Sequence, residues 1–303
     1  VAHSRIVWDD CVRDHSTTTE DFPLPSSSTG PLGSHLNPFL ACYDDQNTMT
    51  TAVYNDLIAF LAICDAFSTP VSSSFFRTIR LGYNCESGLL ESCVFQAALV
   101  DTSGISLRNS TCEMYNIFKI ALAVASGSSQ EKMSVIQREY HAYDVYDEDI
   151  PFLTNEAAEF KRILQAYAHV TDEQWSEIMS ALLCVIHLQC LEFVPDVEHG
   201  RLEVYKISMS SIESSKYIEM LWNTEDGSLE ELLESGGCMT LQDKQNTVDR
   251  LSLEIIRRLF QFLLYRANSS CSHQSDEFRY IEMADSKGYE EWRIILTITY
   301  NSN

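Results

Sequence analysis

The chain is short of positive charge. Its 303 residues include 21 Lys and Arg against 44 Asp and Glu, which gives a formal net charge of -23 at pH 7. A protein whose main partner is a nucleic acid or an anionic membrane needs clustered Lys and Arg to neutralise that partner. The composition therefore argues against both and favours a partner with a basic surface. The alternative is that the acidity only keeps the protein soluble, since the acidic residues are spread along the chain.

The sequence also lacks an apolar run long enough to cross a membrane, and it contains no Cys-x-x-Cys pair. A membrane-spanning helix needs about 20 apolar residues, whereas the most apolar segment, at 171–194, is interrupted by His187 and Gln189. Ten scattered cysteines, several within apolar runs, indicate reduced thiols in a cytoplasmic protein. The chain starts at Val1 without a methionine, which suggests a fragment.

Apolar periodicity predicts more helices than strands. The most strongly predicted helix begins after Thr171, where Gln174 completes a capping box, and its apolar residues leave so little polar surface that other elements must cover it on several sides. A hairpin is predicted from strands at 75–81 and 89–100, and a Ser-, Thr-, Pro- and Gly-rich loop at 16–37. Other helices are predicted at 1–15, 49–67, 114–125, 155–168, 212–221, 229–234 and 248–267, with a strand near 202–207 and final apolar segments at 280–283 and 292–300.

Several segments, in order along the chain, resemble the myosin motor domain. Residues 72–81 (Ser-Ser-Ser-Phe-Phe-Arg-Thr-Ile-Arg-Leu) resemble its switch I stretch Ser-Ser-Arg-Phe-Gly-Lys-Phe-Ile-Arg-Ile. Residues 285–290 (Asp-Ser-Lys-Gly-Tyr-Glu) are similar to its switch II motif Asp-Ile-x-Gly-Phe-Glu. Shorter matches occur at His3–Arg13, Cys64–Ser68, Tyr115–Phe118, Glu159–Arg162, Val185–Phe193, and Arg258–Phe260 with Asn268. The order of these matches identifies the chain as a member of this family.

The resemblance implies an α/β fold, mostly α, in which helices surround a mixed β-sheet as in a partial P-loop NTPase. It implies a phosphate-loop and switch I-like region at 1–110, a large helical, actin-facing subdomain at 111–270, and a switch II-like region at 271–303. It further implies ATP and Mg²⁺ as cofactors, actin filaments as partner, and a cytoplasmic, cytoskeleton-associated protein. The lower actin-binding subdomain, converter and lever arm have no match in the chain.

The resemblance implies seven site residues: Gly30, Ser34, Ser72, Asp285 and Gly288 for nucleotide, Ser34 and Ser73 for magnesium, and Ser73 and Glu290 for catalysis. Two charges are missing from this set. Gly33 stands where the phosphate-loop lysine belongs, and Ser74 stands where an arginine pairs with the switch II glutamate, here Glu290. Because phosphoryl transfer depends on such charges, the resemblance predicts impaired ATP hydrolysis.

Other interpretations of these residues stay open. The loop and switch positions also suit ordinary surface turns, because Ser, Gly and Asp favour turns. Cys184, His187 and Cys190 lie three residues apart on one helix, a spacing that fits metal ligands but more often marks a packed core. Three functions therefore compete: a motor fragment that hydrolyses ATP poorly and acts by binding a protein, an active motor with a rewritten phosphate loop, and a helical adaptor without enzymatic activity.

Overall fold

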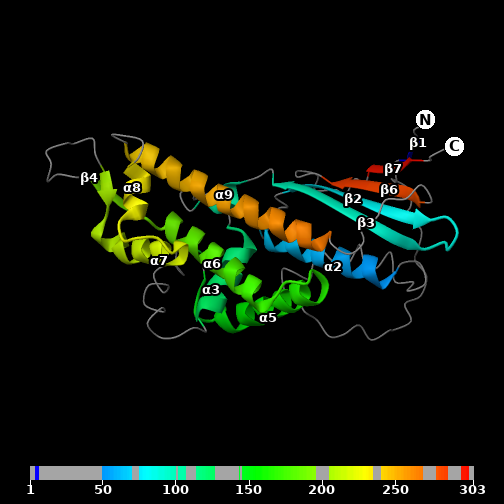
Figure 1. Cartoon of the computed structure of the whole chain (residues 1–303), viewed down its shortest axis with the longest axis horizontal. Coiled ribbons are helices and arrows are strands. Elements are labelled where there is room, and N and C mark those ends of the chain that lie inside the picture. Colours follow the sequence, from blue (N-terminus) through cyan, green and yellow to red (C-terminus); the bar gives the residue numbers. More distant parts are fainter. Residues whose placement is uncertain are drawn as a thin grey trace. The chain divides into compact units, whose positions relative to one another are not determined.

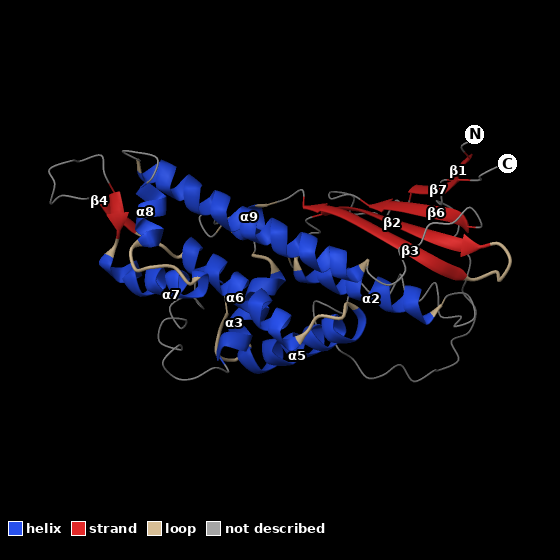
Figure 2. Ribbon diagram, in the orientation of Figure 1, coloured by secondary structure: helices blue, strands red, loops and turns tan. Residues whose placement is uncertain are grey.

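The computed structural model describes residues 4–6, 50–69, 75–99, 102–106, 114–126, 143, 145–195, 205–234, 240–268, 278–285 and 295–299. In these residues helices predominate over strands, so the chain is a mixed α/β protein that is mostly helical (Figure 2). It divides into two compact units. The sheet unit comprises Val1–Val100, Ala166–His169 and Leu263–Asn303, and the helical unit comprises Asp101–Gln165 and Val170–Phe262.

The sheet unit contains a five-stranded sheet in the order β1-β7-β6-β2-β3 (Figure 1). Its strands are β1 (Ser4–Ile6), β2 (Phe75–Asn84), β3 (Leu90–Leu99), β6 (Phe278–Asp285) and β7 (Ile295–Thr299). The predicted hairpin is confirmed as β2 and β3. The resemblance implied a mixed sheet, but every pairing in the described sheet is antiparallel. The antiparallel pairing of β2 and β3 follows from the short turn between them, because a tight turn joins two strands only in antiparallel orientation.

The turn of this hairpin is held by side chains. Asn84 accepts hydrogen bonds from the backbone N–H groups of Glu86 and Ser87, and its own amide donates to Glu91. The hydroxyl of Ser87 donates to the same carboxylate at 2.6 Å. These bonds favour the ionised carboxylate and lower the pKa of Glu91. Gly88 supplies the positive φ of +72° that the turn requires.

The prediction of a helix at 1–15 is wrong for Ser4–Ile6. These residues form strand β1, which pairs antiparallel with β7, Ser4 opposite Ile298 and Ile6 opposite Leu296. A strand partner far away in the sequence decides this conformation, and local periodicity carries no information about that partner. The remainder of 1–15 and the predicted loop at 16–37 lie outside the described residues.

Helix α2 (Thr51–Ala66) confirms the helix predicted at 49–67 and packs against β3 (Figure 1). Thr50 caps it, accepting the backbone N–H of Val53 through its hydroxyl. The aromatic rings of Phe60 and Phe95 stack across this contact, with centroids 4.4 Å apart and planes inclined by 6°. Both side chains are buried, so this pair is part of the core between α2 and the sheet.

The helical unit is arranged around α6 (Asp172–Gln189), the most strongly predicted helix. Its capping box between Thr171 and Gln174 is confirmed, and eleven of its residues from Trp175 to Gln189 are buried. Helices α3 (Asn116–Ser126) and α7 (Ile212–Trp222) contact it. The other elements are the 3-10 helices η1 (Ser103–Ile105) and η4 (Met209–Ser211), α5 (Ile150–Tyr167), α8 (Ser228–Glu234), α9 (Leu241–Ala267), and strands β4 (Phe193–Pro195) and β5 (Tyr205–Ile207). The last residues of α5 and α9 belong to the sheet unit.

Two helices start earlier than predicted. Helix α5 begins at Ile150 instead of 155, because Pro151 falls in the first turn, where the N–H that proline lacks has no helical partner. Helix α9 begins at Leu241 instead of 248. Thr240 caps it: its hydroxyl accepts the N–H of Asp243, whose carboxylate accepts the N–H of Thr240. Part of the segment predicted to connect α8 and α9 is therefore helical.

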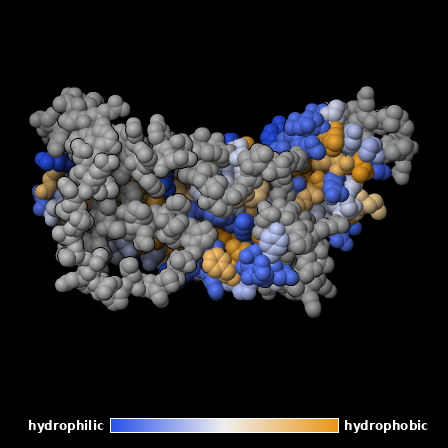
Figure 3. All heavy atoms as spheres, turned by 180° about the vertical axis from the view of Figure 1, so that it is seen from behind, coloured by the Kyte–Doolittle hydropathy of each residue, from blue (hydrophilic) through white to orange (hydrophobic). Residues whose placement is uncertain are grey.

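The surface of the described residues mixes polar and apolar groups. On the face drawn in Figure 3, hydrophilic and hydrophobic side chains are intermingled wherever described residues are visible. The most exposed large apolar side chains are Met209 and Tyr265, at 85% and 72% exposure. None of the helices in the described ranges has the length and apolar character needed to cross a membrane.

Candidate functional site

One of the seven implied site residues falls within the described structure. Asp285 is the last residue of β6. The others lie outside the described residues: Gly30, Ser34, Ser72, Ser73, Gly288 and Glu290. The nucleotide and magnesium sites that the resemblance implies therefore stay predictions.

The two switch-like segments flank neighbouring strands of the sheet. Ser72 and Ser73 precede β2 in the sequence, and Asp285 ends β6. These strands pair antiparallel with Arg77 opposite Asp285, so β2 begins at the end of the sheet where β6 stops. Further along the pair, the guanidinium of Arg80 lies 3.2 Å from the carboxylate of Glu282, directly opposite in the register. The topology thus brings the strand residues next to the first residues of both switch-like segments to one end of the sheet.

A buried carboxylate lies near this end of the sheet. Asp65, close to the C-terminus of α2, is 7% exposed. Burial raises the pKa of its carboxyl to about 7, and the positive charge of Arg77 opposes this rise. Arg77 shares one face of β2 with Ile79 and Leu81, both buried, because alternate residues of a strand point to the same side. Sequence reasoning placed Asp65 in a family-like segment but carried no signal of its burial.

Asn268, which matches an asparagine of the family pattern, follows the last residue of α9 and contacts β3. Its side-chain oxygen accepts the N–H of Phe95 at 2.7 Å, and its amide nitrogen donates to the carbonyl of Phe95 at 2.9 Å. The same nitrogen lies 3.1 Å from the carbonyl oxygen of Leu264. β3 is the last strand in the order of the described sheet. One side chain therefore satisfies both backbone groups of an edge-strand residue in the way a neighbouring strand would.

Replacing Asn268 with alanine is expected to lower the free energy of unfolding by about 1–3 kcal/mol, because two partly buried backbone groups lose their partner. Asn268→Asp retains the acceptor but loses the donor, so an intermediate loss is expected. Urea denaturation measures both effects. Gln261→Ala, which removes an exposed amide on α9, is the control and should change the free energy of unfolding by less than about 0.5 kcal/mol. Equal losses for Asn268→Ala and the control would contradict this role.

The residues Cys184, His187 and Cys190 lie in or beside the core of the helical unit. The imidazole Nδ1 of His187 is 3.4 Å from the hydroxyl oxygen of Ser214, and its ring centroid is 4.5 Å from that of Tyr217. Burial raises the pKa of the Cys184 thiol to about 12, although a hydrogen bond with Trp222 opposes the rise. A thiol that resists ionisation is a poor metal ligand. Within the described ranges, no group of three His, Cys, Asp or Glu residues is arranged to hold a metal ion.

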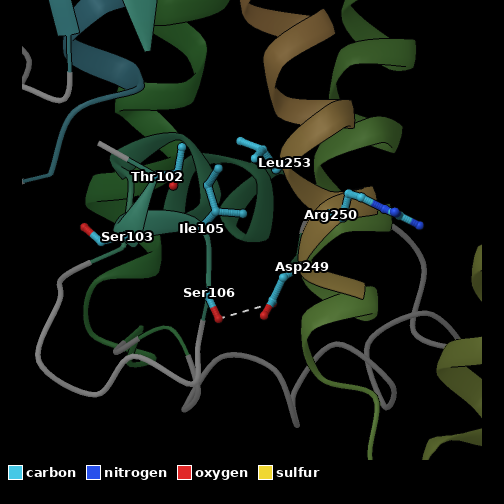
Figure 4. Close-up of a pocket in the computed structure, with 7 residues that line it drawn as sticks. All are labelled: Thr102, Ser103, Ile105, Ser106, Asp249, Arg250 and Leu253. Carbon is cyan, nitrogen blue, oxygen red and sulfur yellow. Dashed lines mark hydrogen bonds between the residues drawn. The ribbon is translucent and has the colours of Figure 1, made fainter. Parts of the chain in front are cut away.

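A pocket of about 550 Å³ lies within the helical unit, between the loop that contains η1 and helix α9 (Figure 4). Its lining residues are Thr102, Ser103, Ile105, Ser106, Asp249, Arg250 and Leu253. The hydroxyl of Ser106 donates to the carboxylate of Asp249 at 3.3 Å. No sequence motif indicates this pocket. The one signal that pointed toward it was Gln189, a polar residue in an otherwise apolar helix, whose amide donates to Asp249 at 3.1 Å.

No known protein-family model matches this chain, and a search of curated proteins finds no match to it either.

Proposed function

We propose that this chain is a myosin-like motor fragment that hydrolyses ATP poorly and acts mainly by binding another protein. The observation that carries the proposal is the pairing of β2 with β6. Through this pairing, β2 starts and β6 stops at the same end of the sheet. Ser72 and Ser73 precede β2 in the sequence, and Asp285 is the last residue of β6. A switch-based nucleotide site requires such a meeting of segments, because both switches must reach the same phosphate and magnesium ion.

Impaired hydrolysis is proposed from the substitutions in the family-like segments. Magnesium and nucleotide would be held by Ser34, Ser73 and Asp285, as the resemblance implies. Gly33 supplies no charge where the family has a lysine, and Ser74 supplies none where the family has an arginine. Bound Mg²⁺ would neutralise phosphate charge, and the missing side chains would otherwise stabilise the charge that develops in the transition state. Binding is therefore expected to be less affected than turnover.

The protein partner proposed from the resemblance is the actin filament. Electrostatic repulsion opposes association of this chain with the filament, because actin is acidic and this chain carries a formal net charge of -23. A partner with a basic surface meets no such repulsion. Cosedimentation with actin filaments, with and without ATP, distinguishes these two partners. Recovery of the chain in the filament pellet supports actin as the partner. Absence of the chain from the pellet at low salt favours a partner with a basic surface.

Binding of a fluorescent ATP analogue in the presence of magnesium tests the nucleotide part of the proposal. We expect micromolar binding without measurable phosphate release. Asp285→Asn should weaken this binding, whereas Asp226→Asn, an exposed turn residue in the helical unit, should not. Rapid phosphate release would favour the active motor with a rewritten phosphate loop. Complete absence of binding would favour the non-enzymatic adaptor and overturn the nucleotide part of the proposal.

A further inference from the structure

Strand β3, the last in the order of the described sheet, has a sequence without the usual protection of an edge strand (Figure 1). Residues 92–100 read Ser-Cys-Val-Phe-Gln-Ala-Ala-Leu-Val and include no charged residue, proline or glycine. Edge strands of this composition pair readily with strands of other chains, and charged side chains or proline commonly prevent such pairing. β3 therefore needs protection from outside its own sequence.

Two other segments of the same chain contact this edge. The carbonyl oxygen of Leu90 accepts the backbone N–H of Thr50 at 3.0 Å. Further along the strand, the side chain of Asn268 bonds to both the N–H and the carbonyl of Phe95, at 2.7 and 2.9 Å. Between these points the register with β2 skips Glu91, as in a β-bulge. Bulges and covering contacts are known means of keeping a sheet edge from pairing.

The bonds of Asn268 also show which backbone groups of β3 face outward. Phe95 lies opposite Ile79 of β2, but its N–H and carbonyl both point to Asn268, so these two residues form a non-hydrogen-bonded pair. Such pairs alternate along an antiparallel ladder, which places the backbone groups of Ala97 and Leu99 on the same outer edge. A strand that added to this edge would have to displace Asn268.

We propose that Asn268 locks a self-association surface, the outer edge of β3, against β3 of a second copy of this chain. Because residues 92–100 are uncharged, two copies of β3 can pair antiparallel about a twofold axis without charge repulsion between the strands. Asn268 follows the last turn of α9, and its amide also donates to the carbonyl of Leu264. Helix ends open more easily than helix centres, so opening of this turn is the step that frees Phe95.

The inference goes beyond the proposed function and does not depend on it. Neither Asn268 nor β3 belongs to a switch-like segment. Failure of nucleotide binding would leave the lock standing, and failure of the lock would leave nucleotide binding untouched.

Sedimentation velocity of the full chain over a range of concentrations tests the proposal. Asn268→Ala is expected to strengthen self-association about tenfold or more, because it uncovers the N–H and carbonyl of Phe95. High salt should increase the effect, since it screens the repulsion between two copies that each carry a formal net charge of -23. Val53→Ala is the control for lost stability. It removes buried methyl groups from α2, also in the sheet unit, and should not promote association.

The double variant Asn268→Ala/Ala98→Lys tests whether the association runs along β3. Ala98 is exposed, and a lysine at this position in each copy would bring two like charges into the strand pair. We expect the double variant to associate as weakly as the unsubstituted chain while keeping the lower stability of Asn268→Ala. In the associated single variant, hydrogen exchange should show added protection of the amides of Ala97 and Leu99.

Three comparisons decide between the lock and its alternatives. Stronger association of Asn268→Ala that Ala98→Lys reverses and Val53→Ala does not reproduce supports the lock, whereas unchanged association of Asn268→Ala overturns it. Equal association of Val53→Ala would assign the effect to partial unfolding, and persistence in the double variant would assign it to another surface. Either result overturns the proposal. If Asn268→Ala does not fold, Asn268→Ser replaces it, because the shorter side chain cannot reach both groups of Phe95.

Discussion

Replacement of Asp65 with asparagine is expected to raise the free energy of unfolding at pH 8 by about 2–4 kcal/mol. Asp65 is 7% exposed, and its burial raises the pKa of the carboxyl from 3.8 to about 7. At pH 8 the folded protein must therefore keep an ionised carboxylate that its surroundings disfavour, even with Arg77 nearby. Asparagine has nearly the same shape and no charge, so it removes this cost.

The direction of the pH dependence follows from the same values. Between pH 3.8 and about 7, the folded state holds a proton on Asp65 more tightly than the unfolded state does. The contribution of this group to stability is thus fully present below pH 3.8, decreases as the pH rises, and is lost above about pH 7. Carboxyls with lowered pKa, such as those of Glu159 and Asp172, act in the opposite direction and lose their contribution as the pH falls.

Urea denaturation of the two proteins from pH 4 to pH 8 isolates the effect of Asp65, because the other carboxyls are common to both. The difference in free energy of unfolding should be near zero at pH 4 and should grow toward pH 8. Glu86→Gln, at an exposed position in the β2–β3 turn, is the control and should change the free energy of unfolding by less than about 0.5 kcal/mol. A difference for Asp65→Asn that does not change with pH would show that its pKa is not raised.

Those parts of the fold that depend on local sequence could be predicted. The β2–β3 hairpin was predictable because Asn84 and Gly88 provide the side chain and the backbone conformation that its turn requires. The start of α6 was predictable because Thr171 and Gln174 bond reciprocally within three residues. In each case the residues that determine the structure are close together in the chain.

The parts that depend on distant partners were not predictable. Strand β1 exists through its pairing with β7, nearly the whole chain length away. The buried state of Asp65 depends on packing in the sheet unit, and the pocket depends on the meeting of the η1 loop with α9. Only Gln189 indicated the pocket, because a buried polar side chain needs a hydrogen-bond partner somewhere in the fold. The nucleotide-site residues were inferred from resemblance alone, since no pattern in the loop around Gly30 and Ser34 identifies them without it.

Replacement of Phe60 with alanine is expected to lower the free energy of unfolding by about 3–5 kcal/mol. Its side chain is 0% exposed, and its ring stacks on Phe95 at a centroid distance of 4.4 Å. The substitution removes this stacking and leaves a cavity between α2 and β3 that the surrounding core fills only in part. Phe60→Leu should cost less, because it retains most of the buried volume. Tyr54→Ala, at a position of α2 that is 41% exposed, is the control and should cost far less.

A double-mutant cycle extends this prediction to the edge of the sheet. Phe95 is held through its ring by Phe60 and through its backbone by Asn268. If each contact helps to position Phe95 for the other, the loss in Phe60→Ala/Asn268→Ala should be smaller than the sum of the two single losses by about 0.5–3 kcal/mol. Additive losses, measured by urea denaturation under identical conditions, would show that the two contacts act independently. A coupled result would identify Phe95 as the residue through which α2 and the end of α9 together position β3. β3 pairs with β2, the strand that contains most of the switch I-like segment.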